Sequence, residues 1–157
     1  MTKYEELLEL ARKEGIQVFE SYFVSDANGL YANGVIVIRD ELSETEKTCV
    51  LAEELGHYYT SIGDISNQLT TDNRKQELTA RKWAVEKIIK IEMLIIAIKE
   101  GCESLFDIAE YLDITIDFLK EAIVAFKRKY GITYRHDNNM IVFNDYGVCV
   151  LDVNAVC

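Results

Sequence analysis

Long apolar segments are missing from this sequence. Its most apolar stretch, residues 88–98, is interrupted by Lys90 and Glu92, whereas a membrane-spanning helix needs roughly 20 consecutive apolar residues. The beginning of the chain carries Glu5 and Glu6, where a signal peptide would have its apolar core. We therefore expect no membrane insertion and no export, and a cytoplasmic location.

Paired cysteines and excess positive charge are also missing. The four cysteines, Cys49, Cys102, Cys149 and Cys157, show no C-x-x-C spacing, so neither a thiolate zinc site nor a disulfide framework is predicted. The formal net charge is −10, and nucleic-acid-binding proteins generally present a basic face to phosphate. We therefore expect no direct nucleic-acid partner and favour a basic protein as the partner.

The composition that remains is typical of a globular protein with one core. The chain has 157 residues, of which 49% are hydrophobic and 28% are charged, and we expect a single domain over residues 1–157. Apolar periodicity and turn signals predict an α+β fold. The expected elements are a helix over 3–14, a small β-meander with strands at 16–19, 22–24 and 35–38, a helix over 43–60, a polar loop over 61–72, a long helix over 73–99, shorter helices over 104–112 and 115–130, and a β-rich tail over 132–157.

The helix expected over 43–60 carries the most informative residues. Ser43 and Glu46 form a capping-box pattern that predicts its start. Glu53 and His57 then share one stripe of the helix, and Glu53-Glu54-x-x-His57 is one residue away from the zincin pattern H-E-x-x-H. In that interpretation Glu53 and His57 are metal ligands and Glu54 is the general base. The alternative is a pair of solvated acids beside an incidental histidine.

A third ligand is expected on the long helix that follows. Glu77 heads an apolar stripe there, whereas Glu86 lies on the opposite side, and Asp64 and Asp72 fall in the polar loop. The stripe consists of Ala80, Ala84, Ile88, Ile91, Ile95 and Ile98. Its two alanines are small enough to allow a close approach to the 43–60 helix. The alternative interpretation of Glu77 is an acid that only favours a helix N-terminus.

These segments together resemble the ImmA/IrrE family of metallopeptidases. The resemblance rests on the strand at 35–40 leading into Leu-Ala-Glu-Glu-Leu-Gly-His-Tyr-Tyr-Thr at 51–60, on Gln-Glu-Leu-Thr-Ala-Arg-Lys-Trp-Ala at 76–84, and on the segment 108–115 with its following helix. It covers a core of roughly residues 15–131 and leaves the tail 132–157 outside. The resemblance implies a zincin-like minimal metallopeptidase with Glu77 in an E-x-x-A-x-x-x-A setting. It also implies cleavage of helix-turn-helix repressors of prophages and mobile elements.

The sequence departs from the family pattern at Glu53, where the family has the first histidine. A set of Glu53, His57 and Glu77 would place two carboxylates on the ion and so lower its Lewis acidity. Oxygen-rich ligation also weakens the preference for zinc. We expect Zn²⁺ as the cofactor, with Mn²⁺ or Fe²⁺ as alternatives.

Two other functions compete with a metal-dependent endopeptidase. The first is a non-catalytic anti-repressor or binding protein on the same fold. The second is a helix-turn-helix regulator built from the helices over 104–112 and 115–130. Their first turns carry Asp107 and Asp117, which would repel DNA phosphates, so we expect these helices to serve in packing.

Overall fold

A computed structural model describes residues 1–61, 70–145 and 147–153, with the side chains of residues 70–72 outside the description. The chain forms two compact units, Met1–Ile88 and Ile89–Cys157, and each is described by itself. The single domain expected over residues 1–157 stays a prediction. Among the described residues, no helix is both long and apolar enough to cross a membrane.

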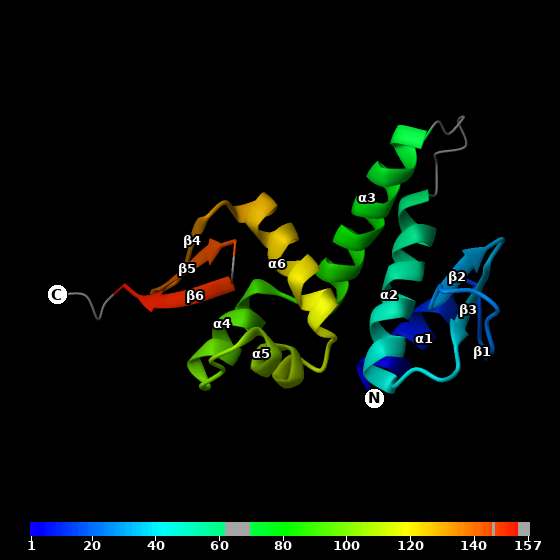
Figure 1. The fold of residues 1–157 in the computed structure, drawn as a ribbon, viewed down its shortest axis with the longest axis horizontal. Coiled ribbons are helices and arrows are strands. Elements are labelled where there is room, and N and C mark those ends of the chain that lie inside the picture. Colours follow the sequence, from blue (N-terminus) through cyan, green and yellow to red (C-terminus); the bar gives the residue numbers. More distant parts are fainter. Residues whose placement is uncertain (62–69, 146, 154–157) are drawn as a thin grey trace. The chain divides into compact units, whose positions relative to one another are not determined.

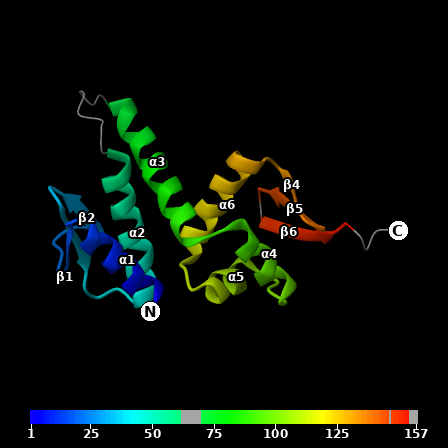
Figure 2. The same ribbon diagram turned by 180° about the vertical axis from the view of Figure 1, so that it is seen from behind.

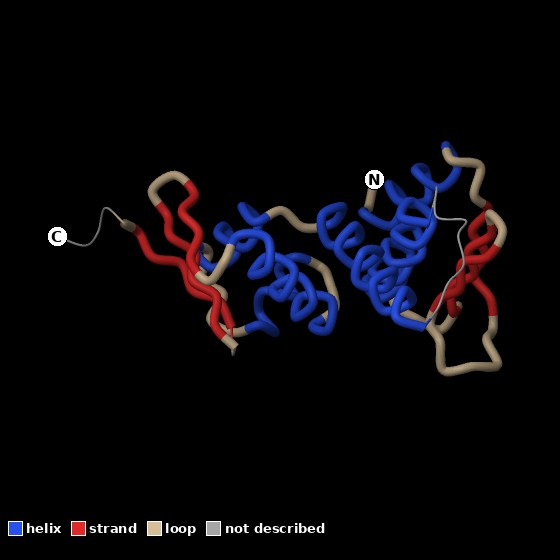
Figure 3. Tube along the Cα trace, turned by 90° about the horizontal axis from the view of Figure 1, so that it is seen from above, coloured by secondary structure: helices blue, strands red, loops and turns tan. Residues whose placement is uncertain are grey.

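The first unit packs three helices on one face of a three-stranded sheet (Figures 1 and 3). Its elements are α1 (Lys3–Lys13), β1 (Gln17–Ser21), β2 (Gly29–Ala32), β3 (Val35–Arg39), α2 (Glu44–Ser61) and α3 (Thr70–Ile88). Helix α1 buries Tyr4, Leu7 and Ala11, which lie one helical turn apart along one face. The amphipathic helix expected at this position is confirmed.

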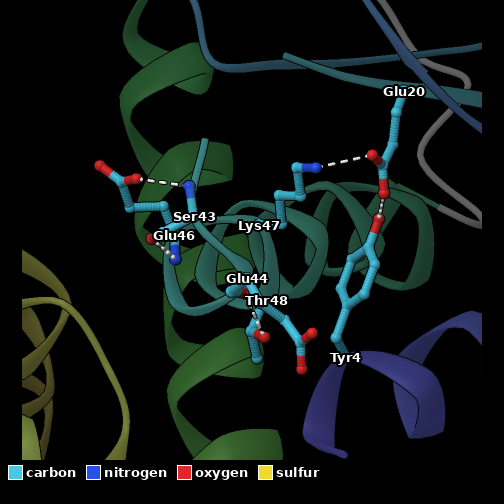
Figure 4. Close-up of polar contacts among 7 residues, drawn as sticks. All are labelled: Tyr4, Glu20, Ser43, Glu44, Glu46, Lys47 and Thr48. Atoms are coloured by element: carbon cyan, nitrogen blue, oxygen red, sulfur yellow. Dashed lines mark hydrogen bonds and ion pairs between the residues drawn. The ribbon is translucent and has the colours of Figure 1, made fainter. Parts of the chain in front are cut away.

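Helix α2 starts at the predicted capping box. The backbone N–H of Ser43 donates to the Glu46 carboxylate at 2.8 Å, and the N–H of Glu46 donates to the Ser43 hydroxyl at 3.2 Å. Figure 4 shows this pair beside a second anchor of the helix, in which the Glu20 carboxylate of β1 accepts from Lys47 Nζ at 2.6 Å and from the Tyr4 hydroxyl at 2.7 Å. Glu20 therefore connects β1 to both α1 and α2.

The sheet of the first unit is not the meander that was expected. Its order is β1-β3-β2, with β1 parallel and β2 antiparallel to β3. No strand forms at residues 22–24, where Tyr22 and Val24 are exposed, and the strand at Gly29–Ala32 was not predicted. Strand β3 is the central strand, and its side chains Ile36 and Ile38 are fully buried.

Helices α2 and α3 approach one another as closely as the small residues allow. A Cβ atom placed on Gly56 of α2 would collide with the backbone carbonyl of Ala80 on α3. Ala80 and Ala84 are buried. The predicted close approach is therefore confirmed, and it fixes the distance between the two helices that carry the candidate ligands. The expected polar loop between them falls largely on residues 62–69, outside the described residues.

The second unit contains three helices on one side of an antiparallel sheet (Figures 1 and 2). Its elements are α4 (Ile91–Lys99), α5 (Leu105–Leu112), α6 (Ile116–Tyr130), β4 (Thr133–His136), β5 (Asn139–Asn144) and β6 (Gly147–Asp152). The capping box of Ser104 with Asp107 and the cap at Thr115 are present. The strand order β4-β5-β6 confirms the expected β-rich tail.

The prediction of one long helix over 73–99 was wrong, because the helix is interrupted between α3 and α4. Lys90 is extended, with φ −105° and ψ 152°. Ile88, Ile89 and Ile91 are 6%, 2% and 4% exposed. Successive residues of a helix point about 100° apart, so one straight helix could not place these three side chains on a single buried stripe. The break allows all of them to be buried.

Candidate functional site

A cavity of about 440 Å³ lies in the first unit, between strand β2 and helices α2 and α3. Its lining residues are Gly29, Leu30, Tyr31, Glu54, His57, Thr60, Ser61, Gln76 and Glu77. Three of the four residues predicted for the site therefore face one space: Glu54, His57 and Glu77. They converge because the close packing of Gly56 against Ala80 brings the two helices together.

His57 and Glu77 are the closest pair of candidate ligands. The Nε2 atom of His57 lies 3.5 Å from a carboxylate oxygen of Glu77, and their side chains are 29% and 59% exposed. Two donors at about 2.0–2.1 Å from one tetrahedral ion lie about 3.3–3.5 Å from each other. The spacing of this pair therefore fits a shared divalent ion.

Glu54 sits deeper, beneath strand β2. A Cβ atom on Gly29 would lie 2.5 Å from a methyl group of Val50 and 3.0 Å from the Glu54 carboxylate, so a glycine at this position lets the strand come close to α2. Burial, with a further contribution from the negative charge of Glu77, raises the pKa of Glu54 to about 7, although a hydrogen bond from the Tyr31 backbone N–H acts in the opposite direction. A carboxyl group with a pKa near neutrality can both accept and donate a proton at that pH.

Glu53 is placed differently from the other predicted site residues. It is half-buried on α2 and is not among the residues that line the cavity. Within the described part of the chain, no group of three or more His, Cys, Asp or Glu side chains is arranged to hold an ion. The donor pair His57 and Glu77 thus fits a metal, whereas the full set of Glu53, His57 and Glu77 stays a prediction.

A comparison with known families matches this region directly. The model described as the IrrE N-terminal-like domain, peptidase family M78, matches residues 11–124. The chain belongs to this family. The match includes the cavity, β2, and the helices that carry Glu54, His57 and Glu77. No curated protein matches the chain.

Membership in peptidase family M78 confirms the resemblance seen in the sequence and makes the fold a small zincin-like α+β domain. The family is one of metallopeptidases, which supports a metallopeptidase-type function for the chain. The Glu-Glu-x-x-His segment lies within the matched residues.

The cavity lining contains residues that the sequence did not single out. Gly29, Leu30 and Tyr31 line the cavity from β2, and Gln76 lines it from α3. In the sequence, the segment that forms β2 is marked only by the turn signals on either side of it, the second of which is Asn33-Gly34. A four-residue strand has too few residues for a clear alternating pattern.

The aromatic residues beside the site form a packed row. Tyr31 contacts Tyr58 edge-on, Tyr58 contacts Tyr59 edge-on, and Tyr59 stacks on Trp83 with ring centroids 4.7 Å apart. The Tyr58 hydroxyl donates to Glu14 at 2.9 Å. These contacts join β2, α1, α2 and α3 around the cavity, so they hold the strand and the helices in their relative positions.

Proposed function

We propose that the protein is a metal-dependent endopeptidase that cleaves a helix-turn-helix repressor of a prophage or mobile element. The observation that carries this proposal is the convergence of Glu54, His57 and Glu77 on one cavity beside an edge strand. Family M78 supplies the reaction class. The protein substrate and the location in the cytoplasm belong to the proposal.

His57 and Glu77 would hold the metal ion, and we propose Glu53, one turn before His57 on the same helix, as the third donor. Such an ion supplies Lewis acidity, which stabilises the negative charge that develops on the oxygen of an attacked amide. Zn²⁺ is the proposed ion. Mn²⁺ and Fe²⁺ are alternatives, because a set with two carboxylates and one imidazole is richer in oxygen than the usual zinc site.

Glu54 is the proposed general base and acid. Its carboxylate would take a proton from the attacking water and pass that proton to the amine that leaves. The raised pKa of about 7 suits both steps, because neither form of the side chain is strongly favoured near neutral pH. The Tyr31 N–H holds the carboxylate toward β2.

The substrate would lie along β2, which is an edge strand of its sheet. An extended peptide can form main-chain hydrogen bonds to such an edge. The net charge of −10 would attract a DNA-binding repressor through that protein's basic face. We therefore propose a basic protein as the substrate, with no direct contact between this chain and nucleic acid.

Cleavage of the repressor encoded beside the gene tests the proposal. The purified wild type should cleave it with Zn²⁺ or Mn²⁺ present and fail to cleave it in EDTA. Glu54→Gln should abolish cleavage while keeping the fold, because the amide has the same size and cannot act as a base. Glu41→Gln is the matched control, since Glu41 is an exposed acid away from the cavity lining.

A non-catalytic anti-repressor is the second candidate function. The observation that favours it is the position of Glu53, which is not among the residues that line the cavity. If the wild type leaves the repressor intact with metal present, while Glu54→Gln still relieves repression in cells, the protein acts by binding.

A further inference from the structure

The sheet of the first unit carries an apolar row on the face that its helices do not cover. Phe19 of β1 and Leu30 of β2 both pair in register with Val37 of β3. Side chains of residues directly opposite one another in a sheet lie on the same face. Phe19 and Leu30 are 51% and 57% exposed, so the row Phe19-Val37-Leu30 is open to a partner.

The other face of the same sheet packs against helix α2. Ile36 and Ile38 are completely buried, Tyr31 contacts Tyr58 of α2, and Glu20 binds Lys47 of α2. These residues alternate along their strands with the members of the row. Figure 3 shows the helices of this unit on one side of the strands. The row therefore points away from the helices.

Leu30 belongs both to this row and to the lining of the cavity. A polypeptide with its scissile bond in the cavity would pass Leu30, which lines the cavity on an edge strand. From Leu30, the next apolar side chains across the outer face of the sheet are Val37 and Phe19. We propose that the row Phe19-Val37-Leu30 is a docking surface for an apolar segment of the protein substrate, adjacent in that substrate to the cleaved segment. This inference rests on the proposed endopeptidase function.

The chemistry of the surface is apolar and not ionic. None of its three side chains is charged, and the cation at its margin, Arg39, is engaged elsewhere. The Arg39 guanidinium donates to the backbone carbonyls of Ser25 and Ala27 and lies 5.5 Å from the ring centre of Phe23. Binding at this surface should therefore depend weakly on salt, in contrast to the electrostatic attraction of the whole chain.

A pair of serine variants tests the surface. Phe19→Ser removes the largest side chain of the row, and Val24→Ser is the matched control, since Val24 is 94% exposed and lies outside the sheet. The probes are the full-length repressor encoded beside the gene and a peptide of about 12 residues spanning its cleavage site. We expect Phe19→Ser to raise the KM for the repressor at least about tenfold with kcat unchanged. Cleavage of the peptide should stay at the wild-type rate, and Val24→Ser should change neither.

A binding measurement keeps the test independent of catalysis. In a Glu54→Gln background, Phe19→Ser should raise the Kd for the immobilised repressor at least about tenfold. Phe19→Leu, which keeps an apolar side chain, should retain most of the affinity. If the wild type cleaves neither probe but binds the repressor through Phe19, the endopeptidase proposal fails and the docking surface stands.

Three results would overturn the inference. The first is a Kd of Phe19→Ser for the repressor equal to that of the wild type. The second is a loss of cleavage in Phe19→Ser that is as large for the peptide as for the repressor. The third is a concentration-dependent dimer of the wild type, seen by light scattering, that Phe19→Ser converts to a monomer. That result would assign the surface to a second copy of this chain.

Discussion

The Nε2 atom of His57 lies 3.5 Å from a carboxylate oxygen of Glu77, although the two residues belong to different helices. The contact exists because Gly56 has no side chain and lets α2 pack directly on the Ala80 backbone. The relative position of these two candidate metal ligands therefore depends on one helix-helix contact.

The first prediction is stabilisation of the protein by divalent metal. Zn²⁺ or Mn²⁺ should raise the melting temperature of EDTA-treated wild type, because an ion that binds only the folded state stabilises it by mass action. At a free concentration of about 100 times the Kd, the gain is about 2.7 kcal/mol. Calorimetry should show the shift in the wild type and none in His57→Ala. An equal shift in both proteins would place the ion elsewhere.

The second prediction concerns Glu53. If it is the third donor, Glu53→Gln should weaken metal binding at least about tenfold, because the amide contributes no charge to the ion. Isothermal titration with Zn²⁺ and Mn²⁺ measures the change. Glu41→Gln serves as the control for the loss of one negative charge. Unchanged affinity in Glu53→Gln would leave His57 and Glu77 as the protein's donors and favour the non-catalytic function.

The third prediction is a fall in stability of the metal-free protein as pH rises from about 5 to 8. Burial raises the pKa of Glu54 from 4.5 to about 7 in the folded state. The folded state therefore holds a proton in this interval that the unfolded state has released, and unfolding becomes easier as the pH increases. Allowing for solvent in the cavity, the loss should be on the order of 1–2 kcal/mol.

Glu54→Gln should remove that part of the pH dependence, because the amide does not titrate. Urea unfolding in EDTA at pH 5, 6, 7 and 8 gives the comparison, with Glu41→Gln as the control. A wild-type curve parallel to that of Glu54→Gln over the whole interval would contradict the raised pKa.

The fourth prediction tests the helix contact. Gly56→Ala should destabilise the protein by about 1–3 kcal/mol, since its Cβ would collide with the Ala80 carbonyl. It should also weaken metal-induced stabilisation, because α2 and α3 must separate. Gly147→Ala is the control, since a Cβ there meets nothing within 4 Å. A change of less than about 0.5 kcal/mol in Gly56→Ala, similar to that of a surface substitution, would show that the helices adjust without cost.

Local signals in the sequence determined where most helices begin and what they bury. The capping box at Ser43 is formed as expected, and the same pattern forms at Ser104, because a cap depends on residues only three positions apart. Helix α6 forms over the predicted segment and buries residues at helical spacing, Phe118, Leu119, Ala122, Ile123 and Phe126. The pairing of Glu54 with His57 on one helix is local in the same sense, since one turn of helix separates them.

Only the tertiary structure decided how these elements meet. The order β1-β3-β2, the break at Lys90 and the short strand β2 depend on which buried surfaces compete for contact, and neighbouring residues carry little information about that. The distance from His57 to Glu77 and the exclusion of Glu53 from the cavity lining follow from the rotation and separation of two packed helices. The sequence by itself thus determined the family, the helix of the site and the candidate residues, whereas packing decided which of them share a cavity, because side-chain convergence is a property of elements far apart in the chain.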